Sequence, residues 1–403
     1  MQNLEGRINT FVETEKRSET EYLSFFTDYA VENNYSLALW RLPNDSRKHA
    51  ILSQKHQALN HEQEIEELPA GFLFAPFDPD KDRIFLAADF SFSFENAILQ
   101  APENPLENRS LAWLREQAIT SRRMRRHAPQ HDHTASVDTT KNNFINVVNE
   151  GVKKIENGLF EKVVASRFAV VPLPDGFDVV RSFQKLCDTY PNALVSFVSL
   201  PGVGSWLGAS PEILVSVEDK RIFKTVALAG TKPYTNTINL KSVAWTQKEI
   251  EEQALVERYI ISCFKKIRLR EYDEHGPKTI IAGNLMHLRS DFTVDMKATN
   301  FPQLGTTMLR LLHPTSAVCG MPLVPALEFI RSSEGYDREF YAGYLGPVNV
   351  KNAVNIFVNL RCAQLLHDSA IIYAGAGITV DSVPDDEWAE TEIKMNTLLS
   401  VIF

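Results

Sequence analysis

Residues 160–167 read FEKVVASR, and this stretch predicts a strand that carries a lysine among apolar residues. Apolar residues surround a lysine and a serine there, a composition that is typical of a strand. Successive side chains of a strand point to opposite faces, so Lys162, Val164 and Ser166 would share one face. Residues 142–157 repeat apolar side chains with helical spacing and end at Gly158, which predicts a helix directly before the strand.

Further along the chain, short apolar runs predict more strands and two long helices. The predicted strands cover residues 193–199, 212–218, 221–228, 278–282, 355–365 and 370–378, and the helices cover 246–269 and 386–402. Tight turns at Asp219-Lys220 and Asp368-Ser369 would join neighbouring strands, which favours antiparallel pairing. Helices and strands do not alternate strictly. We therefore predict an α/β fold, a single large domain with mostly antiparallel sheets flanked by helices.

The N-terminal part of the chain mixes the same two kinds of element. Strands are predicted at residues 36–41 and 83–88, and helices at 21–33 and 111–126. A polar stretch at about residues 115–143 carries a cluster of arginines, and few of its residues could build a core. We expect it to be an exposed connector, which divides the chain into residues 1–140 and 141–403.

Composition excludes several classes of protein. The 403 residues contain 42 Lys and Arg against 51 Asp and Glu, a net charge of −9, which argues against a nucleic-acid binder. No apolar run approaches the roughly 18 residues that a membrane span needs, and the polar N-terminus is unlike a signal peptide. The four cysteines are far apart, as in buried thiols of a cytoplasmic protein. We expect a cytoplasmic enzyme or binding protein.

Two residues stand out as candidates for proton transfer. Lys162 lies among valines, where it is either a base that is neutral part of the time or an edge-strand lysine whose ammonium reaches solvent. Glu212 follows a proline at the start of a predicted strand, in GASPEIL at residues 208–214. It is either an acid with a raised pKa or an exposed strand-end carboxylate. The residues themselves leave both choices open.

Three other patterns suggest binding of charged groups. Glu249 and Glu252 lie early in one predicted helix and Glu387 and Glu390 early in another, where they either offset the helix dipoles or hold a divalent cation. The glycines of YAGAGI, residues 373–378, form either an anion-binding nest or a plain turn. Arg361 lies within an otherwise apolar predicted strand and would need a carboxylate partner.

Taken together, these segments resemble the chorismate-utilising enzymes, which include isochorismate, salicylate, anthranilate and aminodeoxychorismate synthases. The resemblance covers about residues 140–403 and implies the fold of chorismate-binding enzymes, with residues 1–140 as the variable front part of that fold. The matching stretches, in family order, are FEKVVASR, GASPEIL, ALAGTKP, EEQALV, HPTSAVCGMP, YDREFYAGYLG, NLRCA, YAGAGI and EWAETEIK.

Within that family the chain looks most like an isochorismate synthase. HPTSAVCGMP with Ala317 is similar to the pattern of those enzymes, and Lys162 falls where they carry the base that activates water. Ala229 stands where aminodeoxychorismate synthases carry a nucleophilic lysine. One departure is Gln253, where the isochorismate enzymes often have a histidine after the glutamate.

The resemblance implies a magnesium-dependent isomerase that converts chorismate to isochorismate by adding water at C2 and losing the C4 hydroxyl. Lys162 would be the base and Glu212 the acid, and Glu252 and Glu390 would hold Mg²⁺ with Glu249 and Glu387 as helpers. The substrate would be bound by residues of six segments: Ala229, Gly230, Thr231, His287, Ala317, Arg361, Tyr373, Gly375, Gly377 and Lys394.

Salicylate synthase, the anthranilate synthase subunit and a catalytically idle chorismate-binding homologue are the alternative functions. Isochorismate feeds both menaquinone and siderophore biosynthesis, and the residues do not choose between them. We expect a monomer with a small-molecule substrate, no nucleic acid and no membrane association.

Overall fold

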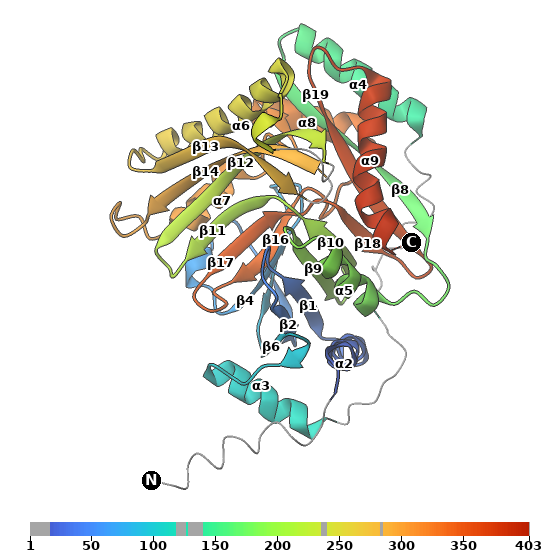
Figure 1. The fold of residues 1–403 in the computed structure, drawn as a ribbon, viewed down its shortest axis with the longest axis vertical. Coiled ribbons are helices and arrows are strands. Elements are labelled where there is room, and N and C mark those ends of the chain that lie inside the picture. The colour runs from blue at the N-terminus through green and yellow to red at the C-terminus, as the bar shows by residue number, and fades with distance from the viewer. Residues whose placement is uncertain (1–16, 118–125, 128–139, 235–239, 283–284, 403) are drawn as a thin grey trace.

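Two large antiparallel sheets form the centre of the molecule (Figure 1). The computed structural model describes residues 17–117, 126–127, 140–234, 240–282 and 285–402. Every pairing between strands in this part of the chain is antiparallel, which confirms the predicted architecture. No helix in these ranges combines the length and the apolar character that crossing a membrane requires.

The first sheet has the order β15-β8-β19-β18-β10-β9-β1-β2-β6-β7. Its strands are, in that order, Gly320–Met321, Lys162–Pro172, Ser369–Ile378, Cys362–Leu365, Gly204–Ser210, Leu194–Leu200, Ser36–Arg41, Lys48–Ser53, Phe90–Glu95 and Ile98–Leu99. The second sheet has the order β13-β14-β12-β11-β17-β16-β4-β5-β3. Its strands are Asp273–Ala282, Leu285–Asp295, Ile222–Pro233, Ile213–Glu218, Val354–Val358, Tyr344–Val348, Gly71–Ala75, Arg83–Ala87 and His56–Leu59.

Helices cover the outer faces of both sheets. They are α2 (Glu19–Glu32), α3 (Pro105–Glu116), α4 (Lys141–Glu156), α5 (Val179–Thr189), α6 (Gln247–Lys266), α7 (Leu304–Leu312), α8 (Leu323–Ser333) and α9 (Pro384–Ile402). Helix α9 packs along β19 with α4 beside it, and α6 lies across β12 and β14 (Figure 1). One hydrophobic core fills the space between the sheets and extends under α6 and α7, and a second lies between the first sheet and α2, α5 and α9.

The N-terminal residues are part of both sheets. Strand β1 pairs with β9 in the first sheet, and β4 pairs with β16 in the second. The two halves of the chain therefore share their sheets across the boundary at residue 140. Most of the predicted connector lies outside the described residues. Arg126 and His127 differ from that prediction, because Arg126 donates to the carbonyl of His367 and His127 is buried against Ser199 and Ser205.

One predicted strand is wrong in an informative way. Residues 355–365 form two strands, β17 and β18, which belong to different sheets. The chain crosses from one sheet to the other at residues 359–361, and Arg361 there has a φ of 46°, in the left-handed region. Non-glycine residues rarely adopt this conformation, and the ones that do are enriched at functional sites.

Candidate active site

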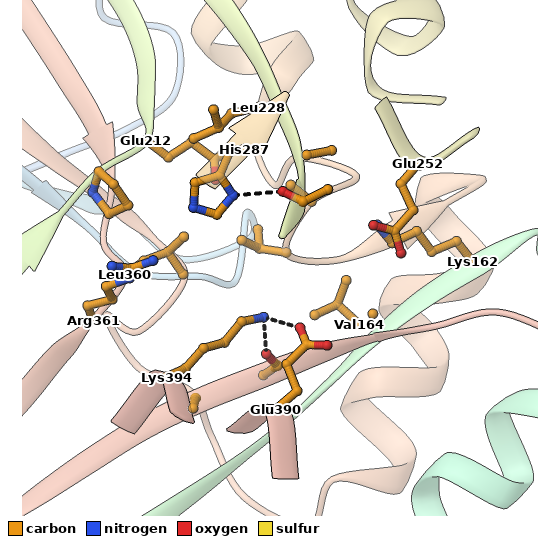
Figure 2. Close-up of a pocket in the computed structure, with 18 of the residues that line it drawn as sticks. Lys162, Val164, Glu212, Leu228, Glu252, His287, Leu360, Arg361, Glu390 and Lys394 are labelled. Atoms are coloured by element: carbon orange, nitrogen blue, oxygen red, sulfur yellow. Dashed lines mark hydrogen bonds and ion pairs between the residues drawn. The ribbon is translucent and has the colours of Figure 1, made fainter. Parts of the chain in front are cut away.

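A cavity of about 230 Å³ lies where β8 and β19 of the first sheet meet β12, α6 and the ends of β10 and β17. Nearly all of the predicted site residues line it (Figure 2): Lys162, Glu212, Ala229, Gly230, Glu249, Glu252, His287, Ala317, Arg361, Tyr373, Gly375, Gly377, Glu390 and Lys394. Thr231 lies in β12 next to this group, but its side chain is outside the described part. Residues as far apart in the sequence as Lys162 and Lys394 therefore converge on one site.

Lys162 faces this cavity from the first residue of β8. It is 6% exposed, and within the described residues its ammonium forms no hydrogen bond or ion pair. Strand β8 lies between β15 and β19, so the edge-strand interpretation of Lys162 is wrong. Gly377 opposite leaves room for the lysine, since a Cβ there would lie 3.0 Å from Lys162 Cε. A buried amine without a partner is placed to accept a proton when it is neutral.

Glu212 enters the cavity from the second sheet, directly before β11. Burial raises the pKa of this carboxyl to about 7, against the opposing positive charges of Lys162 and Lys394. Near neutral pH a substantial fraction of Glu212 is therefore protonated and can donate a proton. Figure 2 shows Glu212 and Lys162 on different sides of the cavity, as an acid and a base acting on opposite faces of a substrate require.

Glu252 on α6 and Glu390 on α9 point into the cavity from two helices (Figure 2). Burial would raise the pKa of Glu390, but Lys394, with help from Lys248 and Lys162, holds it below the ordinary value. Glu390 is thus a carboxylate at neutral pH. Glu252 forms no ion pair with the residues described here, so its oxygens are available to a ligand.

This donor set fits Mg²⁺, which in proteins is commonly held by one or two carboxylates and otherwise by water and substrate. Within the described ranges, no three His, Cys, Asp or Glu side chains come together in a way that could hold a metal by themselves. Glu252 and Glu390 would therefore supply two oxygen ligands and leave the other positions to water and substrate.

The two predicted helper carboxylates have other contacts. Glu249 accepts a hydrogen bond from the backbone N–H of Thr246 and caps α6, and it lies 3.4 Å from the ammonium of Lys232. Glu387 accepts from the hydroxyl of Ser382 and does not line the cavity. Both residues set the start of a helix that carries a candidate metal ligand.

A cationic end of the cavity is formed by Arg361 and Lys394. Arg361 forms no ion pair with any described residue, so the carboxylate partner expected for it is not a residue of this part of the protein. Burial lowers the pKa of Arg361, which means that an anion arriving there would relieve an uncompensated charge. Lys394 already donates to Glu390 and to the carbonyl of Gly375, at 2.7 and 2.8 Å.

His287 lies near the same end and is held in one tautomer. Its Nδ1 lies 2.8 Å from the carbonyl oxygen of Gly230, so Nδ1 carries the hydrogen and donates it. Burial, together with the charge of Arg361, lowers the pKa of His287 to about 4. The imidazole is therefore neutral at physiological pH, and Nε2 is the nitrogen that can accept a hydrogen bond.

Residues 373–378 form neither the nest nor the turn that YAGAGI suggested, because they lie in a strand, and binding of an anion by the N–H groups of Gly375 and Gly377 stays a prediction. Gly375 and Gly377 lie inside β19, opposite Ser166 and Val164 of β8, and neither has a positive φ. A Cβ on Gly375 would come within 3.0 Å of the Tyr341 hydroxyl. These glycines make room in the cavity wall. Tyr373 contributes to the wall from the same strand, with its ring stacked between Tyr341 and Trp206.

Several residues of the cavity were not predicted as site residues. They are Val164, Pro211, Leu228, Lys248, Val318, Tyr341, Leu360 and Ala374. Seven of them fall within the segments that carry the resemblance. The sequence therefore predicted that these segments contribute to the site, but it did not identify these particular side chains. Lys248 is half exposed and lies 3.8 Å from Glu387. It resembles an ordinary surface lysine in the sequence, and only the approach of α6 to α9 reveals it.

The sequence and the fold of the chain are similar to those of known proteins. The family model described as "Chorismate binding enzyme" matches residues 79–403. Isochorismate synthase EntC of Escherichia coli K12 is 31% identical over 246 residues, 60% of this chain and 62% of EntC. Isochorismate synthase DhbC of Bacillus subtilis is 29% identical over 268 residues, 64% of this chain and 66% of DhbC. These alignments span less than two thirds of either relative.

Solved structures of the same kind show the same fold. MenF, the menaquinone-specific isochorismate synthase from Escherichia coli, superposes with a TM-score of 0.74 at 21% identity, over 98% of this chain and 93% of MenF. A putative 2,3-dihydroxybenzoate-specific isochorismate synthase, DhbC from Bacillus anthracis, gives a TM-score of 0.72 at 23% identity. That match covers 94% of this chain and 99% of the other.

Proposed function

This chain belongs to the family of chorismate binding enzymes, and from that membership we propose that it is an isochorismate synthase. The observation that carries the proposal is a single cavity that holds Lys162 and Glu212 on different sides, together with Glu252 and Glu390. Ala229 at the wall supports water as the nucleophile, since a lysine there would supply an amine instead.

The reaction moves a hydroxyl from C4 of chorismate to C2. In the proposed mechanism Lys162 takes a proton from a water molecule, and the resulting hydroxide oxygen forms the new bond at C2. The ring double bond shifts and the C4–O bond breaks, while Glu212 gives its proton to the departing hydroxyl, which leaves as water. Lys162 is then protonated and Glu212 ionised, so a proton exchange with solvent restores both.

Substrate binding uses the charged groups around the reacting atoms. Chorismate carries two carboxylates, and Arg361 and Lys394 would bind the enolpyruvyl carboxylate. The ring carboxylate would lie at the end where Glu252 and Glu390 point into the cavity. Mg²⁺ bound by these two residues would neutralise that carboxylate and draw negative charge from the ring during addition. His287 would accept a hydrogen bond through Nε2.

We also propose a cytoplasmic location. It is supported by the four cysteines, which are free and buried, as is usual where thiols stay reduced. The monomeric state stays a prediction.

The assignment of the base can be tested by replacing it. Lys162→Ala should abolish turnover of chorismate while the protein keeps its fold, measured by circular dichroism, and its Mg²⁺-dependent binding of chorismate, measured by calorimetry. Lys224→Ala removes an exposed lysine that pairs with Glu218 outside the cavity wall, and it serves as the matched control, which should stay active. Wild-type activity in Lys162→Ala would show that another group removes the proton.

A further inference from the structure

Between Val164 and Ser166, the outer edge of β8 bonds to side chains, and no described strand pairs with it there. Strand β15 pairs only with Lys162 and Val163, and β8 continues for nine more residues. An unpaired, buried backbone group would cost free energy comparable to a lost hydrogen bond. Beyond β15 the N–H of Val164 donates to the carbonyl of Cys319 at 2.8 Å. The next groups along that edge bond to Glu334 and Arg338.

Glu334 and Arg338 each form a hydrogen bond with a backbone group at this edge of β8. Glu334 accepts the backbone N–H of Ser166 at 2.7 Å, and Arg338 donates to the carbonyl of Val164 at 2.7 Å. The donor of Ser166 and the acceptor of Val164 are the groups that a further antiparallel strand would pair with. An anion and a cation replace that strand, and they are joined to each other in an ion pair.

The same pair reaches a second wall of the cavity. Arg338 also donates to the carbonyl of Val318 at 2.8 Å, and its guanidinium stacks over the ring of Phe77. Val164 and Val318 both line the cavity, and Lys162 lies two residues before Val164 on the same face of β8. Neither Glu334 nor Arg338 lines the cavity. Any role in the reaction must therefore pass through the groups that they bind, which are these backbone groups and the hydroxyl of Ser166.

Because the ion pair between Glu334 and Arg338 is buried, a contribution to folding stability does not explain its presence. The side chains of Arg338 and Glu334 are 2% and 1% exposed. Removing two charges from water is costly, and apolar residues of similar volume often replace such pairs without loss of stability. Apolar residues could not, however, donate a hydrogen bond to the carbonyl of Val164 or accept one from the backbone N–H of Ser166.

We propose that Glu334 and Arg338 are positioning residues, which hold β8 and the segment around Val318 in the register that aims Lys162 at the substrate. The functional part of this inference rests on the proposed function. Because Arg361 and Lys394 are on other elements, substrate binding should survive loss of the pair while the proton transfer suffers.

The test uses the double variant E334Q/R338M, which removes both charges and leaves no unpaired ion. Its kcat should fall by about 100-fold, the loss typical of a displaced catalytic group, while KM changes by less than about threefold. The control is Glu19→Gln, which breaks the ion pair of another buried carboxylate, to the partly exposed Lys48, and Glu19 does not line the cavity. That control should lower the denaturant midpoint and leave kcat unchanged.

Amide hydrogen exchange supplies a readout that does not depend on activity. In the double variant, exchange should accelerate in residues 162–167 and stay slow in β9. A kcat equal to that of the wild type in fully folded double variant would overturn the proposal, as would acceleration spread evenly over the first sheet. If the wild-type protein makes no isochorismate and the acceleration is still confined to β8, the proposed function fails and the positioning of β8 by the pair stands.

Discussion

The ammonium of Lys394 lies 2.7 Å from a carboxylate oxygen of Glu390, one turn away on the same helix. Glu390 is a proposed metal ligand and Lys394 a proposed substrate contact, so each is bound to the other before either meets its ligand. A cation that binds Glu390 has to compete with Lys394. A carboxylate that binds Lys394 has to compete with Glu390.

Lys394→Met is therefore expected to tighten the binding of Mg²⁺ to the free protein. A partly exposed ion pair contributes up to about 1 kcal/mol, which corresponds to roughly a fivefold change in Kd. Calorimetric titration of the protein with MgCl₂ measures the Kd for Mg²⁺. Glu390→Gln should weaken the same binding strongly. A Kd for Mg²⁺ that does not change in Lys394→Met would show that the lysine does not compete for Glu390.

Glu212→Gln should stabilise the protein at alkaline pH. The pKa of Glu212 is raised to about 7 in the native state, above its ordinary value of 4.5, so the native state binds more protons between these two values. The free energy of unfolding consequently falls as the pH rises through this window. The amide cannot ionise and avoids that loss, a gain on the order of 1–3 kcal/mol at pH 8 that should nearly vanish at pH 4. Urea unfolding at both pH values gives the comparison; an equal difference at both would contradict it.

Arg361→Met should raise the stability of the protein and weaken its binding of chorismate. The guanidinium is desolvated and has no ion-pair partner in the described part of the chain, so its removal should raise the free energy of unfolding by about 1–2 kcal/mol. KM for chorismate should rise about 100-fold, because a charge-assisted pair with a substrate carboxylate is lost. Thermal unfolding and steady-state kinetics test the two halves separately. Lower stability in Arg361→Met would show that the arginine is compensated within the protein.

His287 should stay neutral throughout the working pH range. Its lowered pKa of about 4 places protonation well below pH 6. Nitrogen NMR of labelled protein should show a protonated Nδ1 and an unprotonated Nε2 between pH 6 and 8. A titration near pH 6.5, or the opposite tautomer, would remove His287 as a hydrogen-bond acceptor for the substrate.

The sequence predicted the faces of β8 correctly, because strand alternation is a local property. Lys162, Val164 and Ser166 do share one face, and that face meets the cavity and Glu334. The break at Arg361 could not be predicted in this way. Residues 355–365 read NIFVNLRCAQL, in which the scattered polar residues give no local signal of a break. The change from one sheet to the other depends on partners distant in sequence.

The glycines of β19 show a second limit. Gly375 and Gly377 suggested a turn, since glycine is frequent where the backbone needs unusual angles. Glycine is needed at these positions because Lys162 and Tyr341 approach the backbone closely, which is visible only when β8 and β19 are paired. Roles for Lys162 and Glu212 came from the resemblance. The contacts of Glu334 and Arg338 had no local signal, because the ion pair acts on backbone of segments far away in the sequence.

The product formed from chorismate distinguishes an isochorismate synthase from the related enzymes. The purified protein should be incubated with chorismate, Mg²⁺ and ammonium, and the products separated by chromatography. We predict isochorismate, a dependence on Mg²⁺, and no change when ammonium is omitted. Salicylate with pyruvate, anthranilate that appears only with ammonium, or unchanged chorismate would each show that the protein is not an isochorismate synthase.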